Sequence, residues 1–156
     1  MVIVGTVGRG RRPPQYYAGP GNRFWELLQA SGLVDERLGP DHAERLLQHG
    51  IGLTDLVIER VQPSGREPET VVHSGPFDRA IREVAPEAVA FVSLTAATWY
   101  ARGVGARLPR GFGELGWPVA GVPGFVLPGP SGANNGMPLV LRAALWSDLR
   151  DFLETC

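Results

Sequence analysis

The sequence predicts an α/β protein: a three-layer α/β/α sandwich around a short, mainly parallel sheet of four strands. Two observations predict it. Short apolar, β-branched runs alternate with segments of helical periodicity, and one run, residues 88–92, is continuously apolar, as in strands covered on both faces. The length of 156 residues fits one domain, residues 1–156.

The first strand is expected at Val2–Val4, an apolar run that Gly5 ends. A loop is expected over residues 6–21, because its prolines exclude a helix. Asn22 can cap the helix that follows, which carries apolar residues at i, i+3 and i+4 and ends at Gly32.

A second helix is expected to run from Asp41, with Glu44 as its capping-box partner, to Gly50. The next strand is expected at Leu53–Val57, and a polar connection follows it over residues 63–74.

A helix then starts at Gly75-Pro76, and its apolar face carries Phe77, Ile81 and Val84. Residues 88–92 form the third strand and residues 95–101 a short helix.

A glycine-rich loop over residues 107–117 leads to the last strand, residues 122–127, which Pro123 limits to an edge or a late start. The final helix begins near Pro138, and one side of it carries Leu141, Leu145, Leu149 and Phe152.

In parallel sheets the ligand crevice lies beyond the carboxyl ends of the strands. The expected strands place four segments at that edge: residues 5–21, 54–55, 93–94 and 128–135.

Composition excludes several classes of protein. The one cysteine, Cys156, excludes a disulfide framework and a multi-thiolate metal site. All 15 basic residues are arginine, so lysine-dependent phosphate loops and lysine Schiff-base enzymes are excluded. The net charge of -1 argues against a surface that binds nucleic acid as a whole, but it permits a local basic patch. No run is long and apolar enough to span a membrane and no signal peptide is recognisable, so we expect a cytoplasmic protein.

Two common motifs are matched only in part. The glycines of residues 5–10 follow a strand as in dinucleotide-binding loops, but the prolines at 13 and 14 prevent the helix that such loops require. Residues 129–133 nearly match a nucleophile elbow around Ser131, although all three histidines precede that serine. A small-molecule hydrolase remains an alternative.

Four segments in order carry a more specific signal. They are YYAGPGNRFW at residues 16–25, GIGLTDLV at residues 50–57, the covered strand at residues 88–92, and LPGPSG at residues 127–132. Together they resemble the uracil-DNA glycosylase superfamily, nearest in pattern to its mismatch-specific uracil/thymine branch and its hypoxanthine-type branch. The resemblance spans nearly the whole chain, and residues 17–25 are its most specific part.

The resemblance implies a monofunctional DNA glycosylase of base excision repair, a hydrolase that flips out a deaminated base, uracil foremost, and cleaves its N-glycosidic bond. Its partner is then DNA containing such a base, the protein acts as a monomer, and no metal or other cofactor is implied. A DNA-binding module that has lost hydrolysis is the alternative.

Base-binding residues follow from the same resemblance. Tyr17 occupies the position of the stacking aromatic, and main-chain N–H groups of the first glycine turn are expected to hold the base and its developing negative charge. The candidate base-binding residues are Gly5, Thr6, Val7, Tyr17 and Asn22. Core packing is the other interpretation of Tyr17 and the favoured one for Phe24 and Trp25.

The chain departs from the mismatch-specific branch at both of its asparagines. Thr6-Val7-Gly8 stands where the first loop of that branch carries a water-positioning Asn, and Gly129 stands where its second loop begins with Asn. Asp55 is the leading substitute catalytic residue, since a carboxylate can activate water and stabilise a sugar cation, although it would also suit a turn. Asn22 is the second catalytic candidate, with a helix cap as its alternative role.

The expected DNA contacts lie in two loops. The second loop corresponds to the intercalating loop of the family and comprises Ser131, Gly132, Ala133, Asn134 and Asn135. Its tip is too small to fill a base-pair gap, so extrusion would need help from elsewhere, for example from Met137 or an arginine. The first loop carries the basic cluster Arg9, Arg11 and Arg12, expected to contact phosphate unless it is merely solvated. Asn134 and Asn135 could instead cap the last helix, and no spacing rule decides whether Arg107, Arg110 and Phe112 approach DNA.

Overall fold

The structure is a computed structural model that describes residues 1–9, 15–132 and 136–156. Within these residues one mixed sheet has six strands in the order β3-β2-β1-β4-β6-β5. Its centre is parallel and consists of β1 (Val2–Gly8), β2 (Gly52–Val61), β4 (Val89–Phe91) and β6 (Gly124–Val126). The two outer strands, β3 (Glu69–Val72) and β5 (Gly113–Glu114), are antiparallel to their neighbours.

The expected sheet of four strands is therefore wrong in number, although the four expected strands form the parallel centre. β3 lies in the expected polar connection and forms because β2 runs on to Val61 and supplies a partner for it. β5 has only two residues, too few for any period to be visible in the sequence. The first strand also runs beyond Gly5, so that Thr6–Gly8 pair with β2 and are not part of a loop.

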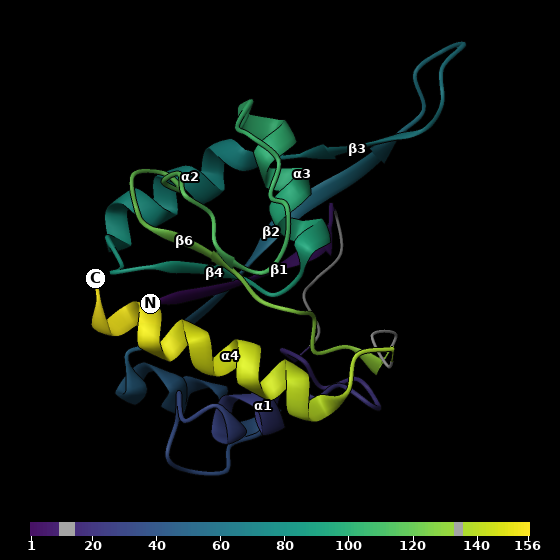
Figure 1. Cartoon of the computed structure of the whole chain (residues 1–156). Helices are drawn as coiled ribbons and strands as arrows, with labels where there is room; N and C mark the ends of the chain where they lie inside the picture. The colour runs from purple at the N-terminus through teal and green to yellow at the C-terminus, as the bar shows by residue number, and fades with distance from the viewer. Residues whose placement is uncertain (10–14, 133–135) are drawn as a thin grey trace.

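Helices cover both faces of the sheet (Figure 1). On one face lie α1 (Phe24–Ala30), the 3₁₀ helix η1 (Pro40–His49) and α4 (Leu139–Glu154). On the other lie α2 (Ser74–Val84) and α3 (Leu94–Val104). Side chains of β1 alternate between the layers, because Ile3 packs with α1 and α4 while Val2 and Val4 pack with α2 and α3.

Three details of the expected helices are wrong. The segment expected as a helix from Asp41 is a 3₁₀ helix that begins after Gly39, with no side-chain cap, so Asp41 and Glu44 form no capping box. Val84 is 66% exposed at the end of α2. On α4 the buried positions are Arg142, Trp146 and Leu149, whereas Leu141 is 49% exposed.

No helix in the part of the chain that the structure describes has both the length and the apolar composition needed to cross a membrane.

Candidate functional site

A cavity of about 480 Å³ opens at the carboxyl ends of the parallel strands. The cavity lies where the order of the strands reverses, because β1 has β2 on one side and β4 on the other. Open α/β sheets bind their ligands at this position. All four segments that the sequence placed at this edge supply lining residues. The lining consists of Gly5, Thr6, Tyr17, Asn22, Asp55, Val92, Ser93, Leu94, Thr95, Phe112, Gly129, Pro130 and Ser131.

Gly5 leaves a notch in the wall of this cavity. A Cβ placed on Gly5 would lie 2.6 Å from Asp55 Oδ1 and 3.0 Å from the Tyr17 hydroxyl oxygen. Gly5 and Asp55 are partners in the register of β1 and β2, so the carboxylate comes over the position where a side chain would stand. A larger residue there would force the carboxylate to shift, whereas glycine lets the two polar groups approach one point.

Asp55 is a half-buried carboxylate. Burial raises the pKa of Asp55 above its ordinary value of 3.8, because the low-dielectric surroundings disfavour the charged form. Its charge also contributes to raising the pKa of Tyr16 and Tyr17, for each of which burial is the larger cause. Both phenols are therefore neutral hydrogen-bonding groups.

Tyr17 combines three unusual features. Its backbone has a φ of 54°, in the left-handed region that residues other than glycine rarely adopt. Its ring stacks on Phe24, with centroids 3.8 Å apart and planes 15° apart, so one face of the ring is covered. Its hydroxyl is buried and has no hydrogen-bond partner among the described residues. Such a group is costly unless a ligand completes its hydrogen bonds.

Asn22 is not the N-cap that the sequence allowed, because Arg23 is the N-cap residue of α1, but its side chain does bond the first turn of the helix. Its Oδ1 accepts a hydrogen bond of 3.0 Å from the N–H of Phe24, the first residue of α1. The same residue lines the cavity. Because its carbonyl oxygen is engaged by the helix, the amide NH₂ is the group it can best offer to a ligand.

The main chain of β1 supplies a further donor. β1 pairs with β4 only as far as Val4, with the N–H of Val92 bonded to the carbonyl of Val4 at 3.0 Å. Alternate residues of a strand direct their N–H and C=O groups to the same neighbour. The main-chain groups of Thr6 therefore face the side on which β4 has ended, at the cavity.

A second cavity, of about 340 Å³, adjoins the first and shares Thr6, Tyr17, Asn22 and Asp55 with it. Val7 lines this second cavity, together with Gln15, Tyr16, Ala18 and Gly19. All five candidate base-binding residues thus lie along the two adjoining hollows.

Side chains of α4 hold the loop after β6 through hydrogen bonds to its main chain. Arg142 is only 3% exposed, and its Nη1 lies 3.4 Å from the carbonyl oxygens of both Gly129 and Ser131. Trp146 Nε1 donates to the carbonyl of Pro128 at 3.0 Å. Arg142 was not among the residues expected from the sequence, because a charged residue is not expected on the buried face of a helix; its spacing of four from Trp146 was the available signal.

The expected DNA-contacting residues are only partly described. Arg9 Nη1 lies 2.8 Å from Glu59 Oε2, so its charge is paired. Ser131 lines the cavity, and Gly132 packs against Gly21. Arg11 and Arg12, like Ala133, Asn134 and Asn135, lie outside the described residues.

The hydrolase alternative lacks a histidine among the residues that line the described cavity. His49 and His73 lie 3.0 Å from the carboxylates of Glu36 and Glu59, and none of the three histidines is among the lining residues. The described lining therefore offers no histidine for the acid–base role that a serine hydrolase requires.

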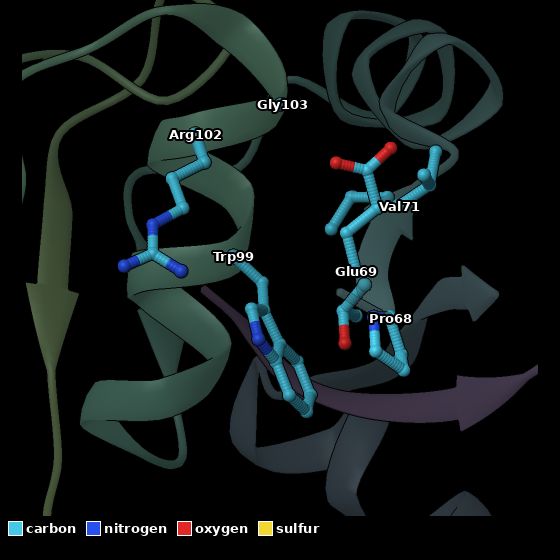
Figure 2. Close-up of a pocket in the computed structure, with 8 residues that line it drawn as sticks. Pro68, Glu69, Val71, Trp99, Arg102 and Gly103 are labelled. Atoms are coloured by element: carbon cyan, nitrogen blue, oxygen red, sulfur yellow. The ribbon is translucent and has the colours of Figure 1, made fainter. Parts of the chain in front are cut away.

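A groove of about 550 Å³ lies elsewhere, between α3 and β3. Figure 2 shows Trp99 and Arg102 on the helix side, with Pro68, Glu69 and Val71 on the opposite side. None of the candidate residues lines this groove, so we place the functional site at the cavity beside Gly5.

Fold and site together define a class: an open α/β/α sheet whose crevice, at the carboxyl ends of its strands, presents stacked aromatic rings, a carboxylate and main-chain donors. A sequence profile of the uracil DNA glycosylase superfamily matches residues 3–150. The chain belongs to this superfamily, whose members are DNA glycosylases, that is, hydrolases that act on DNA.

Proposed function

We propose that the protein is a monofunctional DNA glycosylase that extrudes a deaminated base, uracil foremost, and hydrolyses its N-glycosidic bond. One observation carries the proposal: the Asp55 carboxylate and the Tyr17 hydroxyl converge on the notch at Gly5, in a cavity that opens at the carboxyl ends of the strands. A ligand in the cavity beside Gly5 lies next to the carboxylate, which is an acceptor, and next to the Tyr17 side chain.

Binding of the base uses the remaining wall of the cavity. Phe24 covers one face of the Tyr17 ring, so the base stacks on the opposite face or against the ring edge. The N–H of Thr6 and the amide NH₂ of Asn22 donate to carbonyl oxygens of the base. Uracil, hypoxanthine and thymine all present such oxygens.

Asp55 is the group that activates water. As the water oxygen bonds to C1′ of the sugar, a water proton passes to Asp55, the bond from C1′ to the base nitrogen breaks, and its electron pair leaves with the base. The N–H of Thr6 and the Tyr17 hydroxyl stabilise the negative charge on the departing base. Because the chain has no lysine, no lysine imine forms with the abasic sugar, which stays in an uncut DNA strand.

A second candidate function is a DNA-binding module without hydrolysis. The observation that favours it is the sequence at both asparagine positions of the mismatch-specific branch, which here are Thr6-Val7-Gly8 and Gly129. In that case Asn22 serves only to accept the hydrogen bond from the N–H of Phe24 at the start of α1.

One assay separates the two functions. Oligonucleotides carrying uracil, hypoxanthine or a thymine mismatch are incubated with the protein, and abasic sites are then cleaved with alkali. We expect product from uracil, and a decrease in single-turnover rate on the order of a hundredfold for Asp55→Asn. Asp148→Asn, the same change on the exposed side of α4, is the matched control. No product at stoichiometric protein would support the binding module.

A further inference from the structure

The loop between α3 and β5 borders the cavity with a large, exposed apolar side chain. Phe112 lines the cavity and is still 39% exposed, so it stands at the cavity mouth. The other exposed lining residues, Thr6, Thr95 and Ser131, are small and polar. Phe112 is thus the one large apolar side chain among the exposed residues that the structure describes in this lining.

The same loop carries cations that no carboxylate of the described residues neutralises. Arg107 and Arg110 are exposed, and neither forms an ion pair with the residues that the structure describes. The arginines near the first loop differ, because Arg9 is paired with Glu59 at 2.8 Å and Arg23 with Glu26 at 2.9 Å. Arg107 and Arg110 can thus contact phosphate without first breaking an ion pair to a described residue, whereas Arg9 and Arg23 cannot.

A hollow of about 230 Å³ connects these features. It is lined by residues 107–112 together with Glu114 and Leu115, and it shares Phe112 with the base cavity. Phe112 therefore belongs to the lining of both, and the lining of the hollow also includes Arg107 and Arg110.

Extruding a base leaves a gap in the stack, and proteins that open a stack frequently insert an apolar side chain into it. Ser131 and Gly132, the described residues of the expected intercalating segment, have no such side chain, and Gly132 is packed against Gly21. We propose that Phe112 is the wedge that enters the base stack while Arg107 and Arg110 hold the adjacent phosphates. This inference rests on the proposed function and names the part of the chain that opens the duplex.

The test compares uracil in a duplex with uracil in a single strand. A wedge matters only where a stack must be opened, so Phe112→Ala should lower the single-turnover rate on the duplex by on the order of tenfold and leave the single-strand rate unchanged. Phe112→Leu should keep most of the duplex rate. Val104→Ala, which shortens a similarly exposed apolar side chain (40% exposed) at the end of α3 that lines neither the cavity nor the hollow, is the matched control. Equal losses on both substrates, or no loss on either, would overturn the inference.

A second measurement does not depend on excision. A 2-aminopurine placed beside the uracil becomes brighter when the stack opens, so binding of the wild-type protein should raise its fluorescence and Phe112→Ala should remove most of that rise. If the wild-type protein excises nothing, the proposed function fails while this titration still decides the role of Phe112. A rise that is unchanged in Phe112→Ala would exclude the wedge.

Discussion

Gly5 is the smallest residue of the site and the one that determines its geometry. Gly5→Ala would place a methyl carbon 2.6 Å from Asp55 Oδ1, closer than van der Waals contact allows, so the carboxylate must move. Because misplacing a reacting group by about 1 Å lowers rates on the order of a hundredfold, we expect a loss of that size in single-turnover excision of uracil. Gly75→Ala, at a glycine with open space around it, should leave the rate unchanged.

Asp55 contributes opposite effects to activity and stability. Its pKa is raised by burial, so the base form is lost as the pH falls through a value above 3.8, and the excision rate should fall with it. The folded state binds this proton more tightly than the unfolded state does. The protonated Asp55 carboxyl group therefore contributes its full stabilisation of the folded state below pH 3.8. This contribution is lost as the pH rises through the raised pKa of Asp55.

Asp55→Asn should consequently be more stable than the wild-type protein at neutral pH while being far less active, and its rate should no longer fall with acid. Urea unfolding at pH 7 and a pH–rate profile measure the two effects. An Asp55→Asn protein that is less stable than the wild type at pH 7 would mean that the carboxylate is structural.

The Tyr17 hydroxyl is buried without a partner among the described residues, so removing it should not destabilise the fold. Tyr17→Phe should therefore retain the free energy of unfolding while losing activity on uracil, if the hydroxyl binds the base. Tyr17→Ala should lose activity by a larger factor than Tyr17→Phe, because it also removes the ring that stacks on Phe24. Equal stability and equal activity in Tyr17→Phe would assign the hydroxyl no function.

Several residues of the site were predictable because their signals are local. A glycine at a strand end, an aromatic residue beside Asn-Arg-Phe-Trp and an aspartate on the neighbouring strand can be read from short segments, and Gly5, Tyr17 and Asp55 line the cavity. Thr95 and the position of Phe112 at the cavity mouth could not be read in this way. They reach the site through α3 and the loop after it, whose path depends on packing.

At the scale of elements, α3 connects the cavity to the core. Ser93 lines the cavity and its hydroxyl accepts a hydrogen bond of 3.0 Å from the N–H of Ala96, which caps the helix. Ser93→Ala should lower the free energy of unfolding by about 1 kcal/mol. Ser93→Asp keeps an acceptor at the cap and should restore most of that loss in urea unfolding; failure of Asp to restore it would mean that the serine acts by packing.

The sequence predicts the central elements better than the outer ones for a physical reason. A strand covered on both faces must be apolar, so β4 is visible in composition, whereas β3 needs only one neighbour and keeps polar residues. Arg142 on α4 is a buried residue that composition does not reveal. It is buried because the loop after β6 offers it two carbonyl oxygens, and these come within its reach only in the folded chain.

At the scale of the whole molecule, the net charge of -1 provides no general attraction to DNA. Affinity must then come from local arginines, of which two groups belong to loops of the site: Arg9, Arg11 and Arg12 in the first loop, and Arg107 and Arg110 in the loop before β5. The two groups can be separated by the salt dependence of binding, because each neutralised phosphate releases counterions independently of the others.

Replacing Arg107 and Arg110 by glutamine should reduce the slope of log K against log salt concentration by about 0.9 for each phosphate that the variant no longer neutralises. The same replacement of Arg11 and Arg12 tests the first loop, where an unaltered slope would mean that these side chains never contact phosphate. Arg150→Gln, at the far end of α4 and paired with Asp151, leaves the slope as it is. If both pairs act, the variant without all four arginines shows the sum of the two changes, because phosphates bound by separate loops are independent.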